Sequence, residues 1–280
     1  VSLLTALMPR MSRAAARGDH VGVVSDLTLG SRLTALTLIP VTAAFTVLGP
    51  AIGIVIYAHG ATTADEARQV GVVLGASAFG LVPFALTMLQ LRVFYAVKDA
   101  RTPTLINIGM VLAKIVISAM VPTLLPDRHV VLGLAVATSL SYIVGVVLGE
   151  VLLRRRFGEL GTRLVIQTTT RLLVLSVIGG VAAWAVQALV LSRLGQGLAG
   201  SGVSVLLGSV AGLLALAAVA SRWHVEEFRE LTAALRGRGA QPSTARPPAR
   251  GPARPVGRVP LRTVPVEHRG RSSGGRHRAR

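Results

Sequence analysis

A short basic segment between two long apolar runs constrains this chain more than any other feature. Residues 91–103 separate apolar runs at 70–91 and 104–125, each close to the ~20 apolar residues that a helix needs to cross a ~30 Å hydrocarbon core. The segment holds three cations and one acid, in the order Arg92, Lys98, Asp99 and Arg101. Because Lys and Arg beside spanning helices are retained on the cytoplasmic side, we expect a cytoplasmic turn between two transmembrane helices.

Composition supports an integral membrane protein. Of 280 residues, 51% are hydrophobic and 15% charged, and the mean hydropathy is +0.62, whereas soluble domains are about 25% charged. The formal net charge of +18 comes mostly from the region beyond residue 235, where arginine is dense and Glu267 is the single acid. The absence of cysteine excludes disulfides, Cys-ligated zinc and a thiol nucleophile.

The apolar pattern predicts an all-α, polytopic membrane fold. We expect residues 1–221 to form the transmembrane region, with spans at about 33–57, 70–91, 103–125, 130–153, 166–191 and 201–221. The apolar run at 1–8 is too short to span, so we interpret it as the end of a truncated first helix and the sequence as the C-terminal portion of a longer chain. Each connection expected outside carries one basic residue, whereas the inside connections carry several; the outside ones are Arg68, Arg128 and Arg193.

Two segments follow the last span. Apolar residues at helical spacing predict a short amphipathic surface helix at 222–237. Residues 238–280, rich in Pro and Arg, cannot bury a core and should form a basic, disordered cytoplasmic tail. Anionic lipid headgroups suit such a tail, at about 1 kcal/mol per basic residue near the surface. Nucleic acid is disfavoured because no aromatic side chain is present for bases to stack on, and a merely solvated tail is the other alternative.

The residues of the spans show no catalytic pattern. We find no glycine-rich phosphate loop, no histidine pair at metal spacing and no two carboxylates in one span, so we predict no enzyme, cofactor or metal site. The one acid inside an expected span, Glu150, precedes Arg154 by four residues and should form an ion pair with it. Small residues at four-residue spacing predict close helix contact: Gly133, Ala137, Ser141, Gly145 and Gly149.

Lys114 is the exceptional polar residue of the spans. It lies about 16 Å along its helix from Pro103, near the middle of the bilayer, where a lysine costs roughly 2.5 to 3.5 kcal/mol. We expect it to face a cavity or a partner, with Asn107 and Ser118 on the same helix face. Two interpretations stay open: a functional cation, or a buried lysine satisfied by hydroxyls and carbonyls of neighbouring helices.

Three motifs resemble one known family. They are the helix end with Pro9, Arg10, Ser12 and Arg13; the turn with Arg92, Tyr95, Lys98, Asp99, Arg101, Thr102 and Pro103; and the run from Gly133 to Ser139. In order and spacing they resemble the MurJ/MviN lipid II flippases of the multidrug/oligosaccharidyl-lipid/polysaccharide exporter superfamily, over residues 1 to about 221. The resemblance implies most of the second lobe of a two-lobe exporter fold plus two extra helices.

The resemblance also implies a function and several partners. The family moves lipid II, the lipid-linked peptidoglycan precursor, across the bacterial cytoplasmic membrane by alternating access, and its last two helices are associated with a groove for the polyprenyl tail. In members with a proposed sodium site, the matching positions look like Lys114, Ser118 and Thr138, so a lysine here would put a fixed charge at the ion's place. A second departure is Gly60-Ala61-Thr62-Thr63, which lacks the family's aromatic residue.

Alternatives to a flippase remain open from the residues alone. Another exporter of the superfamily, for drugs or polysaccharide lipids, fits the same spans. So does a non-transporting membrane anchor that gathers cell-wall synthesis proteins through its tail. An arginine-rich first lobe upstream would discriminate transport from anchoring.

Overall fold

The computed structural model describes residue 9, residues 11–158 and residues 160–222. Helices form all the regular structure of that part: α2 (His20–Tyr57), α3 (Ala64–Ala78), α4 (Leu81–Ala96), α5 (Arg101–Leu124), a 3-10 turn (Asp127–His129), α6 (Val130–Phe157), α7 (Thr162–Leu194) and α8 (Leu198–Arg222). The predicted all-α fold is therefore confirmed. Residues 1–8, Arg10, the expected surface helix from residue 223 onward and the tail at 238–280 lie outside the described residues.

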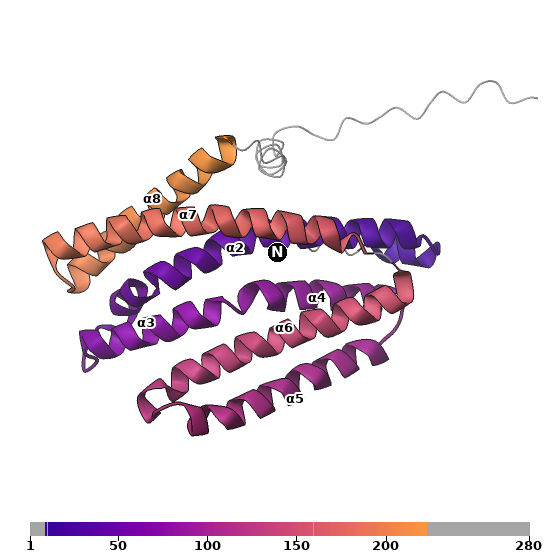
Figure 1. The fold of residues 1–280 in the computed structure, drawn as a ribbon, viewed down its shortest axis with the longest axis horizontal. Coiled ribbons are helices and arrows are strands. Elements are labelled where there is room, and N and C mark those ends of the chain that lie inside the picture. The colour runs from indigo at the N-terminus through magenta and orange to yellow at the C-terminus, as the bar shows by residue number, and fades with distance from the viewer. Residues whose placement is uncertain (1–8, 10, 159, 223–280) are drawn as a thin grey trace, which may run out of the picture. The chain divides into compact units, whose positions relative to one another are not determined.

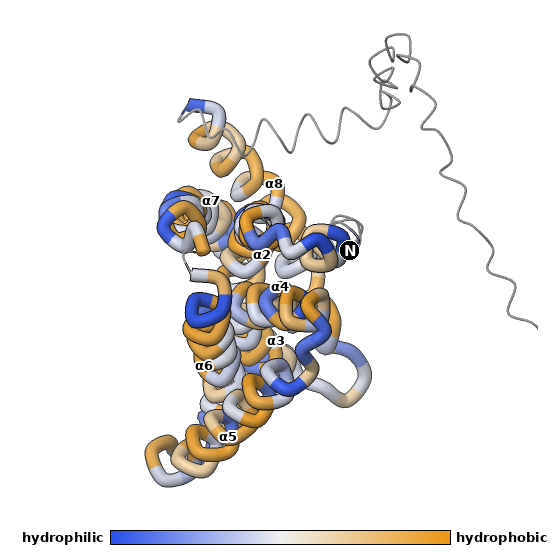
Figure 2. The backbone as a smooth tube through the Cα atoms, turned by 90° about the vertical axis from the view of Figure 1, so that its right-hand side faces the viewer, coloured by the Kyte–Doolittle hydropathy of each residue, from blue (hydrophilic) through white to orange (hydrophobic). Residues whose placement is uncertain are grey.

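Six helical segments are long and apolar enough to cross a membrane, with α3 and α4 together forming one of them. The connections gather at two ends of the helix bundle (Figure 1). We call the end with residues 97–100 and 158–161 the basic end, and the end with residues 58–63 and 195–197 the far end. Large apolar side chains cover the outward faces, for example Leu112 and Ile115 on α5 and Leu206 on α8. Figure 2 shows that hydrophobic residues predominate along α5 and α8, as expected of a multi-pass membrane protein.

The first long helix starts earlier than the expected span at 33–57. α2 begins at His20, where the Asp19 carboxylate caps it by accepting a hydrogen bond from the Gly22 backbone N–H at 2.8 Å. Its first turns bury Val23 and Leu27 in a cluster that also contains Met11. This packing explains why the segment before residue 33 is helical although it is too polar to lie in lipid.

The expected span at 70–91 is divided between two helices. α3 ends at Ala78 and α4 begins at Leu81. Pro83 has no N–H to donate to the carbonyl of Phe79, so the helical hydrogen bonding fails one turn before the proline. Gly80 at the break lies against α6, because a Cβ added there would be 2.8 Å from Ser139 Oγ.

The small-residue stripe of α6 packs as predicted. All five of its members are buried, and α6 contacts α3, α4 and α5. A Cβ added at Gly145 would lie 2.3 Å from Met110 Sδ, and one at Gly149 would lie 2.3 Å from Gln90 Oε1. The glycines thus allow α5 and α4 to approach α6 closely.

The last two helices, α7 and α8, both pack against α2. α7 contacts α2 and α8 extensively, and α8 also contacts α2. Although α6 and α7 are consecutive, they are not among the helix pairs that pack extensively in the described part of the chain. The space between them, over α2 and α4, is the position of the site described next.

Candidate lipid groove

An apolar groove of about 620 Å³ lies between α6 and α7. Its floor comes from α2 and α4, and its lining includes Ile39, Val47, Val82, Ile143, Leu173 and Trp184. Along α7 the lining runs from Thr169 to Trp184, about 22 Å at 1.5 Å per residue. The groove is long enough to accommodate an extended hydrocarbon chain through more than half of a ~30 Å bilayer core.

Two threonine hydroxyls in the groove are turned to the backbone of the helices, whereas Ser176 Oγ, also in the lining, has no hydrogen-bond partner among the described residues. Thr42 Oγ1 donates to the Ala78 carbonyl at 3.2 Å, and Thr46 Oγ1 donates to the Thr42 carbonyl at 2.8 Å. Thr42 and Thr46, which make α2 unusually polar, therefore donate their hydroxyl hydrogens to groups within the protein. What remains for a ligand is an almost entirely apolar surface, which favours hydrocarbon over a polar substrate.

At the basic end the groove continues into a second pocket of about 510 Å³, whose lining is mostly apolar but includes several polar side chains. Leu86, Val146 and Thr169 line both spaces. The pocket adds polar side chains from α2, α4, α6 and α7: Thr28, Ser31, Gln90, Glu150, Arg154 and Thr162. The apolar groove thus opens into a chamber whose lining also contains polar and charged side chains, an arrangement that suits an amphipathic lipid.

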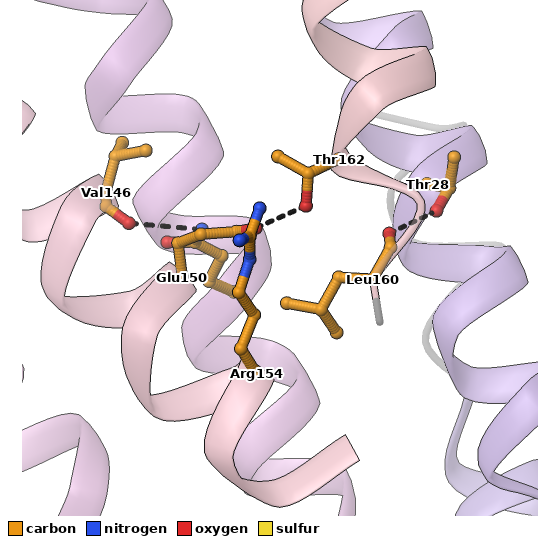
Figure 3. A network of polar contacts seen from close by, with 7 residues as sticks. Thr28, Val146, Glu150, Arg154, Leu160 and Thr162 are labelled. Carbon is orange, nitrogen blue, oxygen red and sulfur yellow. Dashed lines mark hydrogen bonds and ion pairs between the residues drawn. The ribbon is translucent and has the colours of Figure 1, made fainter. Parts of the chain in front are cut away.

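Hydrogen bonds across this chamber join α4, α6 and α7 and link α2 to the connection between α6 and α7 (Figure 3). The predicted pair is confirmed, since Arg154 Nε lies 2.9 Å from Glu150 Oε1. Glu150 also accepts a hydrogen bond from the Thr162 hydroxyl, which ties α6 to the start of α7. Gln90 Nε2 donates to the Val146 carbonyl at 3.3 Å, and Thr28 Oγ1 donates to the Leu160 carbonyl at 3.1 Å. The hydrogen bonds and the ion pair among the lining residues therefore stabilise the shape of the chamber.

The turn motif at the basic end is built around Asp99. Its carboxylate accepts hydrogen bonds from the backbone N–H of Arg101 at 3.1 Å and from the backbone N–H and hydroxyl of Thr102 at 3.2 and 2.8 Å. The Thr102 hydrogen bonds, with a smaller effect of Arg156, hold the pKa of Asp99 below its ordinary value. Asp99 thus caps the start of α5, whose first turn buries Pro103.

The remaining residues of the turn motif and of the helix-end motif have different environments. Lys98 adopts a left-handed backbone with φ of 60°, Tyr95 is half-exposed, and Arg92 makes an interaction within the described part. At the helix-end motif, Arg13 Nε donates to the Pro9 carbonyl at 3.1 Å and Ser12 is exposed. Arg10 lies outside the described residues.

The four residues of the cation hypothesis lie on the far side of the bundle from the groove. Lys114 and Asn107 are exposed on α5, and Ser118 is partly exposed. Thr138 on α6 donates to its own helix at the Leu134 carbonyl, 3.0 Å away. None of the described residues forms an ion pair with Lys114. Nor do the described residues contain a group of three or more His, Asp or Glu side chains that could hold a metal ion.

Sequence reasoning missed the partners that come from distant helices. The Asp99–Arg156 pair spans 57 residues, and the hydrogen bond between Gln90 and Val146 spans 56. Position within a span could have marked Gln90 as a buried amide, but no local pattern identifies its partner. The groove itself depends on the lack of packing between α6 and α7, which has no sequence signal.

Comparison with known proteins decides the family. The model of the lipid II flippase MurJ family matches residues 1–199. The chain belongs to this family. It is 35% identical over 101 residues to a probable lipid II flippase MurJ of Synechocystis sp., covering 36% of this chain and 19% of the relative. It is 31% identical over 140 residues to a probable lipid II flippase MurJ of Chlamydia pneumoniae, covering 50% of this chain and 25% of the relative.

A solved structure confirms the fold expected for the family. The chain resembles a lipid II flippase MurJ in an inward closed conformation with a TM-score of 0.59 at 19% identity. That match covers 80% of this chain and 43% of the solved one, so the chain spans less than half of the related structure. The family is one of transporters and not of enzymes.

Proposed function

We propose that the protein moves lipid II from the inner to the outer leaflet of the bacterial cytoplasmic membrane by alternating access, without enzyme chemistry. The observation that carries this proposal is the apolar groove between α6 and α7 that opens into the chamber at the basic end. A polyprenyl chain has no hydrogen-bonding groups, and the groove offers almost none. Membership of the flippase family supports the same substrate.

In this proposal the groove holds the lipid tail while the headgroup crosses elsewhere. A polyprenyl chain is already surrounded by hydrocarbon in the bilayer, so its binding to the groove would come from van der Waals packing against the lining and not from burial away from water. One wall of the groove is α7, which together with α8 packs against α2. Movement of α2 would therefore carry the tail site with it.

The orientation in the membrane is part of the proposal. The basic end faces the cytoplasm, because the arginines of the 158–171 region and the cations of the 91–103 turn gather there. The C-terminal tail at 238–280 would then be cytoplasmic, where it binds anionic lipid headgroups and is available to cell-wall synthesis proteins.

Lys114 is proposed to act as a fixed cation in place of a bound sodium ion. An ammonium in the middle of a span requires counter-charges or acceptors, and none of the described residues supplies an ion pair. Asn107, Ser118 and Thr138 would complete the polar surroundings of this charge. The close approach of Met110 to Gly145 and of Val121 to Gly133 supports this grouping, because it packs α5 against α6 along these turns.

Complementation tests the proposal. The natural full-length protein is expressed in cells depleted of their own flippase, and lipid II exposed on the outer face is quantified. We expect growth and lipid II exposure to be restored. Normal abundance in the membrane without any lipid II exposure would contradict the proposal and would favour an anchor or an exporter of another lipid.

A further inference from the structure

We propose that a pocket at the far end of the groove binds the phosphate group of a lipid whose hydrocarbon chain occupies the groove. This inference rests on the proposed function, because it requires the groove to hold a lipid chain. It adds a second polar site, opposite to the chamber at the basic end. The ligand chemistry is that of a lipid phosphate in the outer leaflet.

The far-end pocket has a volume of about 420 Å³ and lies between α2, α3, α7 and α8. Val47 and Trp184 line both this pocket and the groove, so the two spaces are continuous. The groove thus opens at each end into a pocket that contains polar side chains. A lipid could extend its chain along α7 and place its first polar group here.

Arg68 gives the pocket its charge. Of the described residues that line the pocket, it is the only one with a charged side chain. Arg68 Nη1 donates to Gln196 Oε1 at 3.0 Å, and this hydrogen bond holds the Arg68 side chain across the opening of the pocket. A guanidinium has five N–H donors in a planar fork, so donors remain for a phosphate oxygen.

A buried hydroxyl without a partner points to a ligand. Ser201 lines the pocket, its side chain is 0% exposed, and its Oγ has no hydrogen-bond partner among the described residues. Burying a hydroxyl without a partner is unfavourable, and a phosphate oxygen would satisfy it. Gln187, 7% exposed, adds an amide to the same lining.

The surroundings favour an anion over a cation. Ser201 belongs to the first turn of α8, where the helix carries partial positive charge. Asp65 and Glu66 are near Arg68 in sequence but do not line the pocket. Glu66 is engaged with Thr63, whose backbone N–H and hydroxyl donate to its carboxylate at 2.8 and 2.9 Å. An amine headgroup would find no carboxylate in this lining.

Binding of matched lipids tests the inference. The natural full-length protein in detergent is titrated with undecaprenyl phosphate and with the uncharged alcohol undecaprenol, and complexes are counted by native mass spectrometry. We expect the phosphate to bind about tenfold or more tightly than the alcohol, which corresponds to one charge-assisted interaction. Excess inorganic phosphate should not displace it, because the chain supplies most of the affinity.

Three variants make the test specific. Arg68→Gln should bring the two lipids to nearly equal affinity. Ser201→Ala should weaken the phosphate about threefold or more, leave the alcohol unchanged and not lower the melting temperature, because it removes a buried hydroxyl that has no partner. The control is Arg193→Gln, an exposed arginine at the same end that does not line the pocket, and it should keep the full preference.

The outcomes separate this inference from the proposed function. Equal binding of both lipids by the parent protein, or an equal loss of preference in Arg193→Gln, would overturn the phosphate site alone. Displacement by inorganic phosphate would overturn the assignment to a lipid. Failure of both lipids to bind would overturn the lipid groove and this inference with it.

Discussion

Arg156 Nη1 lies 2.6 Å from Asp99 Oδ2 and so joins the last turn of α6 to the turn that precedes α5. Asp99 is 19% exposed and Arg156 43% exposed, so water screens the pair only in part. The same carboxylate caps α5 through Thr102. One acid therefore fixes the α4–α5 connection relative to α6.

Asp99→Ala should destabilise the basic end by about 1 kcal/mol, the usual cost of losing a cap. Thermal unfolding in detergent, followed by circular dichroism, measures this loss. Arg156→Gln should cost less, because the cap hydrogen bonds remain. A melting temperature unchanged by Asp99→Ala would show that the turn does not depend on its carboxylate.

The contribution of Asp99 should depend on pH with a definite sign. Its pKa is lowered in the folded protein, so its contribution is fully present above the ordinary aspartate pKa of ~3.9 and is lost as pH falls through the folded value. The stability difference between the parent protein and Asp99→Ala should therefore shrink below pH 4 or so. A difference that grows with acidity would contradict this sign.

Lys114→Met keeps the length of the side chain and removes its charge. If the ammonium replaces a bound cation, the variant should insert normally but expose about tenfold less lipid II or worse, and the parent should transport equally in sodium and potassium. Protein abundance in the membrane is the control. Full activity of Lys114→Met, or a clear sodium requirement of the parent, would end the fixed-cation hypothesis.

Deletion of residues 238–280 should leave transport largely intact. The described residues that line the groove and both pockets lie between Leu27 and Ser201, and the proposed pathway needs only these. Cells depleted of their own flippase should grow on the truncated protein. Loss of growth at normal membrane abundance would assign the tail an essential role.

Gly71→Ala tests the close approach of α3 to α2. A Cβ there would lie 2.8 Å from Pro50 Cα and closer still to the Gly49 carbonyl, so backbone must move, at about 1 to 3 kcal/mol. The control is Gly202→Ala on α8, where nothing lies within 4 Å and the better helix former should stabilise by up to about 1 kcal/mol. Equal melting temperatures of the two variants would argue against tight α2–α3 packing.

Local patterns in the sequence predict most of the helices and some contacts. Apolar runs and turn charges indicate the membrane helices, and the spacing of Glu150 and Arg154 predicts their ion pair. The early start of α2 carries a signal too, because Asp19 precedes the helix as a typical cap. These features depend on neighbours within one or two turns.

Features that depend on distant helices could not be predicted. Asp99 could have paired with many arginines, and its choice of Arg156 follows from how α6 ends beside the turn. The unpartnered hydroxyl of Ser201 becomes visible only when α7, α8 and α2 surround it. The position of Lys114 along α5 follows from helix geometry, whereas its exposure on the surface of the helix bundle does not follow from the sequence.

The groove is the central claim, and a pair of tryptophan variants on α7 tests it most directly. Val181 lines the groove and Leu189 does not, yet both side chains are 59% exposed. Outer-face lipid II is measured for Val181→Trp and Leu189→Trp in cells that carry only the variant, at matched abundance. We predict that Val181→Trp fills the groove and reduces lipid II exposure severalfold, while Leu189→Trp retains the parent level. Equal activity of the two variants would contradict a role of the groove in transport.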